Sequence, residues 1–143
     1  MALLLDEARA LFREALAASL PPTDPLSRLL RCGENYLAFG LAEPQRYRLL
    51  FANEDDTQEA PRERGESDVG AGLQFLMALV RDCQAAGQLP TAGDSYELAI
   101  AYWATCHGLV SLYLSGGGAA RFEVAQYLRL SRRSLRLVVG APP

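Results

Sequence analysis

Few side chains in this sequence could act as a nucleophile or a general base. The 143 residues contain one histidine, His107, and three cysteines, Cys32, Cys83 and Cys106. A thiol nucleophile needs a base within hydrogen-bond reach. On a helix, however, the adjacent Cys106 and His107 would point about 100° apart, so they do not form a natural nucleophile-base pair. Because paired carboxylates and a phosphate-binding loop at usable spacing are also lacking, we expect no enzymatic activity.

The histidine and the cysteines also lack the short spacing that zinc ligands have in a sequence. We therefore expect neither a metal ion nor a cofactor. Widely spaced cysteines without a Cys-x-x-Cys motif are typical of a reducing compartment. The apolar run at the N-terminus is short and is soon followed by charged residues, unlike a signal peptide. The sequence thus predicts a cytoplasmic protein.

Binding is the chemistry that the remaining residues favour. His107 could orient a ligand or a bound water, or it could be a core histidine hydrogen-bonded to a neighbour close to Trp103, one turn away. Tyr36 and Tyr47 stand out because a buried phenol usually needs a hydrogen-bond partner. Ligand pockets are mostly apolar with a few polar groups. The candidate ligand-binding residues are Phe12, Leu16, Tyr36, Phe39, Tyr47, Phe75, Leu79, Trp103 and His107. A plain packed core would use the same residues, and both interpretations stay open.

One long apolar segment must position Trp103 and His107. From Leu98 to Leu114 there is no charged residue. Asp94 can cap the N-terminus of a helix there, and three glycines from residue 116 onward end it. The segment therefore predicts a single helix of about five or six turns.

This helix has two unlike faces. The large side chains on one face are Tyr96, Trp103, His107, Val110 and Leu114, and the mostly small ones opposite are Ala101, Thr105, Gly108 and Leu112. A helix that is apolar all round must be buried all round. We infer that the large face fills the core and that the small face meets a second helix at close range, which another copy of the chain could supply. A monomeric bundle is one alternative. A membrane span is another, although 17 uncharged residues are at the lower limit of about 17–25 for spanning.

Five further helices are predicted around this one. Helical periodicity and proline or glycine boundaries place them at about 2–19, 25–41, 44–52, 67–86 and 119–139. The charged residues 53–65 lack periodicity and predict a surface loop, or a lid over a pocket. We therefore expect one all-α domain of six helices over residues 1–143. A net charge of −3 does not favour nucleic acid as a partner of the whole domain, and the arginines of the last helix are interpreted as a solvated face.

The order of several motifs resembles a known family. A proline-started helix, PQRYRLLF, precedes the charged loop; a long helix ending in AAGQLP and the segment WATCHGL follow. Trp103, His107 and Gly108 form a Trp-x3-His-Gly pattern. This order is similar to the C-terminal regulatory domain of TetR-type bacterial repressors, in the subgroup marked by a Trp-His-Gly motif. The opening MALLLDEARALF resembles the first helix after the DNA-binding part of that family.

The resemblance implies an effector-sensing, homodimeric transcription regulator domain. The last two helices of each subunit would form a dimeric four-helix bundle, with an interface of Ala101, Thr105, Gly108, Leu112, Phe122, Leu128 and Leu135. The other helices would enclose a cavity for a small apolar or amphipathic effector, with no membrane contact. Family members begin with a helix-turn-helix domain. Because residues 1–143 resemble only the regulatory part, we expect that domain to be absent and this chain to make no direct contact with operator DNA. The alternative is a stand-alone helical dimerisation or interaction module without a ligand.

Overall fold

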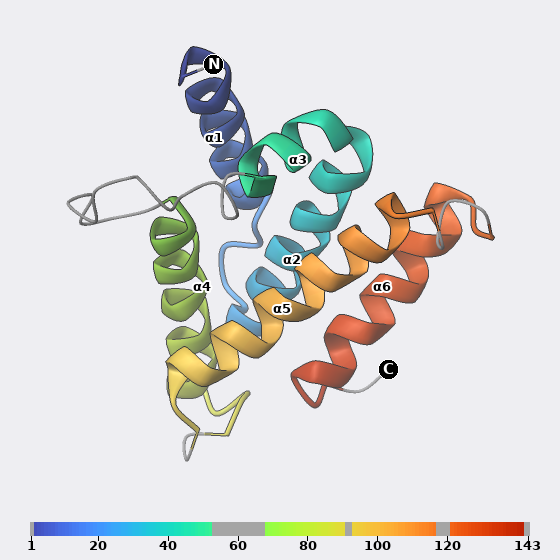
Figure 1. Cartoon of the computed structure of the whole chain (residues 1–143). Helices are drawn as coiled ribbons and strands as arrows, with labels where there is room; N and C mark the ends of the chain where they lie inside the picture. The colour runs from blue at the N-terminus through green and yellow to red at the C-terminus, as the bar shows by residue number, and fades with distance from the viewer. Residues whose placement is uncertain (1, 53–67, 91–92, 117–120, 142–143) are drawn as a thin grey trace.

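The structure is a computed structural model, and it describes residues 2–52, 68–90, 93–116 and 121–141. These residues form six helices and, within the described ranges, no strand. The helices are α1 (Ala2–Ala17), α2 (Pro25–Ala42), α3 (Pro44–Ala52), α4 (Asp68–Ala85), α5 (Ser95–Leu114) and α6 (Val124–Val138). The predicted all-α, six-helix fold is thus confirmed (Figure 1). The predicted loop over residues 53–65 lies outside the described residues.

Most helix ends lie where capping residues predict them. α2 begins with Pro25 in its first turn, and the Asp24 carboxylate accepts a hydrogen bond from the Ser27 amide at 2.9 Å. At the start of α5, the Asp94 carboxylate accepts one from the Tyr96 amide at 3.0 Å. Gly87 follows α4 with a φ of +74°, a conformation that residues with a side chain rarely adopt. The sequence signals for starting and ending these helices therefore act as expected.

The start of α6 differs from the prediction. We expected this helix to begin near Ala119, but it begins at Val124, and residues 121–123 lie outside it. The Gln126 side chain accepts a hydrogen bond from the Glu123 amide at 3.1 Å. This bond satisfies a backbone donor that the first turn leaves without a helical partner. The start of the helix therefore coincides with a capping box formed by Glu123 and Gln126.

Helix α2 lies at the centre of the domain and packs against each of the other five helices. α4 packs against α2 and α5 on one side, and α6 packs against the same two helices on the other (Figure 1). Gly33 makes the crossing of α2 with α5 possible, because a Cβ atom there would lie 2.2 Å from the Tyr102 hydroxyl oxygen. That hydroxyl donates a hydrogen bond to the Leu29 carbonyl at 2.8 Å. The core is therefore built on a close approach that only glycine permits.

The buried face of α5 is rotated from the one predicted. The structure buries Ala99, Tyr102, Cys106 and Val110, whereas Tyr96 is 49% exposed. Trp103 and His107 are half-buried at the edge of this face. The prediction that Tyr96 is in the core was wrong. Gly33 has no side chain, and the phenol of Tyr102 fills the space beside it, so the core face of α5 centres on Tyr102 and Cys106.

The opposite, small face of α5 is largely uncovered within one chain. Ala101 is exposed and Leu112 is 64% exposed. A Cβ atom added at Gly108 would have no neighbour within 4 Å. The hydroxyl of Thr105 donates to the Ala101 carbonyl at 2.8 Å, so it uses its own helix for this bond. Among the described residues, no helix is both long and apolar enough to cross a membrane.

Candidate functional site

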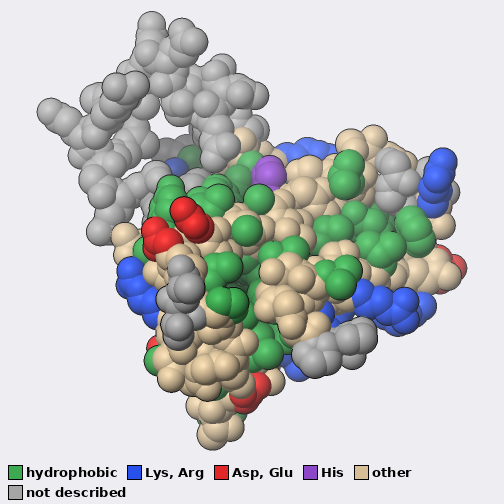
Figure 2. Space-filling view, turned by 90° about the horizontal axis from the view of Figure 1, so that it is seen from below, with side chains coloured by type: hydrophobic (Ala, Val, Ile, Leu, Met, Phe, Trp, Pro, Cys, Tyr) green, Lys and Arg blue, Asp and Glu red, His purple; other side chains and the backbone are tan. Residues whose placement is uncertain are grey.

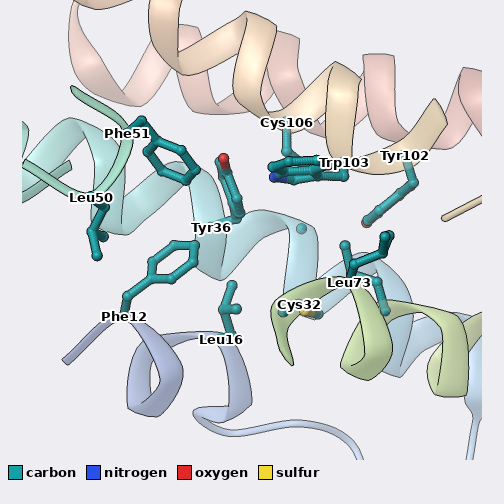
Figure 3. Close-up of a pocket in the computed structure, with 13 residues that line it drawn as sticks. Phe12, Leu16, Cys32, Tyr36, Leu50, Phe51, Leu73, Tyr102, Trp103 and Cys106 are labelled. Carbon is teal, nitrogen blue, oxygen red and sulfur yellow. The ribbon is translucent and has the colours of Figure 1, made fainter. Parts of the chain in front are cut away.

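A cavity lies inside the domain between the first five helices (Figure 3). Its volume is about 50 Å³. A single water needs roughly 10–15 Å³ of such space. The cavity as it stands thus admits a few waters, and a larger occupant requires side chains to move. Its walls are formed by Phe12, Leu16, Cys32, Gly33, Tyr36, Leu50, Phe51, Gly72, Leu73, Leu76, Tyr102, Trp103 and Cys106.

Four of the predicted ligand-binding residues line this cavity: Phe12, Leu16, Tyr36 and Trp103. Three others do not line it and pack in or against the core: Phe39, Phe75 and Leu79. Tyr47 and His107 instead line a second hollow on the outside of the domain. The predicted set therefore combined residues of the inner cavity, the packed core and the outer hollow. Helical periodicity identifies the buried face of a helix, but it does not show which part of that face borders a void.

Sequence reasoning missed several apolar wall residues, among them Leu50, Leu73 and Leu76. It also missed the two glycines on the wall, Gly33 and Gly72. A glycine within an apolar helical stripe leaves the volume of a side chain empty, and this was the available signal for a cavity. At Gly33 the phenol of Tyr102 takes part of that space, whereas at Gly72 no atom lies within 4 Å of an added Cβ.

Three polar groups meet beside the cavity. The Tyr36 hydroxyl lies 2.9 Å from the Tyr47 hydroxyl, which lies 2.5 Å from Nδ1 of His107. Tyr36 is also 3.3 Å from the same nitrogen. Burial, and next the neighbouring Tyr47, raise the pKa of the Tyr36 phenol far above its usual value, so this phenol keeps its proton. With a neutral His107 whose Nδ1 accepts, Tyr47 donates to the imidazole and Tyr36 donates to Tyr47. Each phenol thus has the partner that the sequence predicted it would need.

His107 combines features of both interpretations that the sequence left open. Its imidazole is hydrogen-bonded to Tyr47, and its ring centroid lies 6.4 Å from that of Trp103. It is nevertheless only half-buried, and the histidine side chain reaches the surface in Figure 2. There it lines the outer hollow, about 440 Å³ in volume, together with Tyr47, Arg48, Phe51, Ser111, Leu114 and Ser115.

The three cysteine thiols are free and buried. Burial raises the pKa of Cys32 to about 12 and that of Cys83 to about 11. It raises the pKa of Cys106 even further above the usual range. The reactive thiolate is therefore a very small fraction of each group at neutral pH. Among the described residues, no group of three or more potential ligands could hold a metal ion.

We therefore expect the native cysteines to be almost inert toward alkylation. At pH 8 the folded protein should react with iodoacetamide at least roughly tenfold more slowly than the protein unfolded in urea, because the folded state raises the thiol pKa values and blocks access. Mass spectrometry after timed quenching measures the number of modified thiols. Rapid modification of a thiol in the folded protein would contradict the buried environment described here.

Comparison of the sequence with known protein families identifies its family. Residues 29–135 match the family described as tetracyclin repressor-like, C-terminal domain. The chain belongs to this family. The matched range covers most of α2 and all of α3, α4 and α5, and it ends at Leu135 in α6. The recognition of a TetR-type regulatory domain from its motifs is thus confirmed, whereas its placement in the Trp-His-Gly subgroup remains a prediction.

A solved structure shows the same fold as this TetR-type domain. It is titled "Structure of a protein with unknown function from Rhodococcus sp. RHA1". The alignment has a TM-score of 0.72 and 22% sequence identity, and it covers 96% of this chain and 70% of the other. No curated protein matches the chain. The chain is therefore a TetR-type regulatory domain, of a kind that generally serves ligand binding and dimerisation and is typically dimeric.

Proposed function

We propose that this TetR-type domain senses a small effector and forms a homodimer, and that it does so without itself contacting operator DNA. Residues 1–143 would be regulatory domain throughout, and DNA would be contacted by a separate helix-turn-helix domain. The domain would be non-catalytic and would act in the cytoplasm. The observation that carries the proposal is the position of the cavity, which lies directly against α5, the helix whose opposite face is uncovered.

This position supports a link between effector binding and the dimer. Trp103 and Cys106 line the cavity, and Gly108 lies about half a turn after Cys106 on the same helix, on its uncovered face. An occupant larger than a few waters must displace wall residues, and α5 contributes three of them. Its displacement would change how the outer face of α5 meets a second subunit. The effector then favours one of two dimer states, provided that it binds them unequally.

The surface of the last two helices supports dimerisation. Seven large apolar side chains are exposed in the described residues, and six of them lie on α5 or α6: Tyr96, Leu112, Val124, Leu130, Leu137 and Val138. An apolar surface of this kind is typical of an interaction site. Leu135, which we had assigned to the interface, is fully buried in the chain's own core. Phe122 and Leu128 are half-buried. We therefore propose that Leu130 and Leu137, in place of Leu135, contribute to the dimer interface.

Two measurements on one sample test this function. Light scattering during gel filtration should give twice the chain mass of 15.6 kDa at micromolar concentration. A panel of small apolar and amphipathic compounds should contain one that raises the melting temperature and changes the fluorescence of Trp103, the only tryptophan. A monomer at all concentrations would refute dimerisation. A panel without any effect would remove the support for sensing.

The small size of the cavity supports a second candidate function. Because the cavity has a volume of only about 50 Å³, the domain could be a helical dimerisation module that binds no effector. This alternative predicts a stable dimer whose melting temperature and tryptophan fluorescence respond to no compound. A saturable change of both signals would exclude it.

A further inference from the structure

Two hollows lie on either side of Phe51. The inner cavity is lined almost entirely by apolar side chains. The lining of the outer hollow includes residues with polar side chains, among them Arg48, His107 and Ser111. Phe51 lines both. An inner apolar cavity and a more open, mainly apolar hollow with one arginine in its lining thus share one aromatic wall.

The Phe51 ring is placed as a partition between the two hollows. Its centroid lies 4.6 Å from the Tyr47 ring and 4.8 Å from the His107 ring on the outer side. On the inner side it lies 6.2 Å from the Phe12 ring, and Figure 3 shows Phe51 and Phe12 beside Tyr36 around the cavity. Phe51 is half-buried in the last turn of α3. Rotamer changes at binding surfaces are common, and a rotation of Phe51 is the movement that a ligand spanning both hollows would require.

The outer hollow favours an anion. Arg48 is exposed, and its guanidinium donates to the Leu114 carbonyl at 3.4 Å. Among the described residues, no acidic side chain forms an ion pair with it. In contrast, the neighbouring Arg46 is paired with Glu43 at 2.8 Å. A carboxylate in the outer hollow would therefore add a charge-assisted hydrogen bond from Arg48 without breaking an ion pair seen in the structure.

We propose that the effector of this domain is a small amphipathic organic anion, bound with its carboxylate in the outer hollow at Arg48 and its apolar body in the inner cavity against Trp103. This inference rests on the proposed sensing function and assigns the ligand's chemical class and orientation. Its apolar body must turn the Phe51 ring aside to enter. Each methylene that becomes buried should tighten binding roughly three- to fourfold until the cavity is filled.

Octanoate and octan-1-ol test the charge and the apolar body separately, because they share a chain length and differ at the head group. Trp103 is the only tryptophan and lines the inner cavity, so its fluorescence reports on the apolar body. We expect octanoate to change this fluorescence in a saturable way. Replacing Arg48 with glutamine (Arg48→Gln) should weaken octanoate binding roughly tenfold, in the range of a lost charge-assisted hydrogen bond. The same variant should weaken octan-1-ol binding much less, because the alcohol carries no charge.

Arg31→Gln is the matched control, because Arg31 is an exposed arginine on α2 that lines neither hollow. It should leave both affinities unchanged. Equal binding of acid and alcohol, with no effect of Arg48→Gln, would overturn the anion proposal and leave the sensing function intact. Equal weakening by both arginine variants would also overturn it, because it would indicate a general charge effect. No fluorescence response to either compound would overturn the anion proposal and count against sensing itself.

Discussion

Replacing Gly33 with alanine is expected to lower the free energy of unfolding by about 2–4 kcal/mol. A Cβ atom at this position would lie 2.2 Å from the Tyr102 hydroxyl oxygen and 2.8 Å from Cδ1 of Leu135. Both neighbours are fully buried, so neither can move into solvent. Relief of the clash requires α2 to separate from α5 and α6, or the Tyr102 hydroxyl to lose its 2.8 Å bond to the Leu29 carbonyl.

Urea denaturation followed by circular dichroism measures this loss. Gly72→Ala is the matched control, because Gly72 is also within a helix but has no atom within 4 Å of an added Cβ. Alanine there should raise the stability by up to about 1 kcal/mol through its higher helix propensity. If both substitutions stabilised the protein equally, the close approach of α2 and α5 would be wrong.

Replacing Gly108 with leucine is expected to weaken the proposed dimer roughly tenfold to a hundredfold while the folded chain is preserved. Within one chain, nothing lies within 4 Å of an added Cβ at Gly108, and leucine has a higher helix propensity than glycine. The isolated chain therefore tolerates the change. In a dimer that brings this face against another helix, the larger side chain would force the two backbones apart.

Light scattering over a dilution series measures the dissociation constant, and thermal unfolding confirms that the monomer is folded. Ala10→Leu adds apolar surface at an exposed position of α1, away from the proposed interface, and should leave the dimer unchanged. A Gly108→Leu protein that stays dimeric throughout the series would mean that the small face of α5 is not at the interface.

The helices of this domain were predictable because their signals are local. Asp24 and Asp94 mark helix starts, and Gly87 marks the end of α4, each through contacts within a few residues. The start of α6 was missed because it depends on one side chain, Gln126, whose bond to the Glu123 amide competes with the helix propensity of the preceding alanines.

The site was less predictable because it depends on contacts between distant residues. The general need of buried phenols for a partner singled out Tyr36 and Tyr47, but it did not predict that they would bond to each other or that His107 would join them. The rotation of α5 that buries Tyr102 follows from the gap above Gly33, on another helix. Sequence periodicity identified the helices, and only their packing shows that the cavity lies beside this crossing.

The central place of α2 has a consequence for how the chain is made. α2 is synthesised before α6, yet part of its surface is completed only by that helix. Arg132 of α6 bonds to Glu34 of α2 across 98 residues of sequence at 2.8 Å, and Leu135 packs beside Gly33. Contacts of such high sequence separation form late, and a nascent chain grows from its N-terminus. During synthesis, the apolar side of α2 that contacts α6 therefore stays uncovered until α6 has emerged from the ribosome.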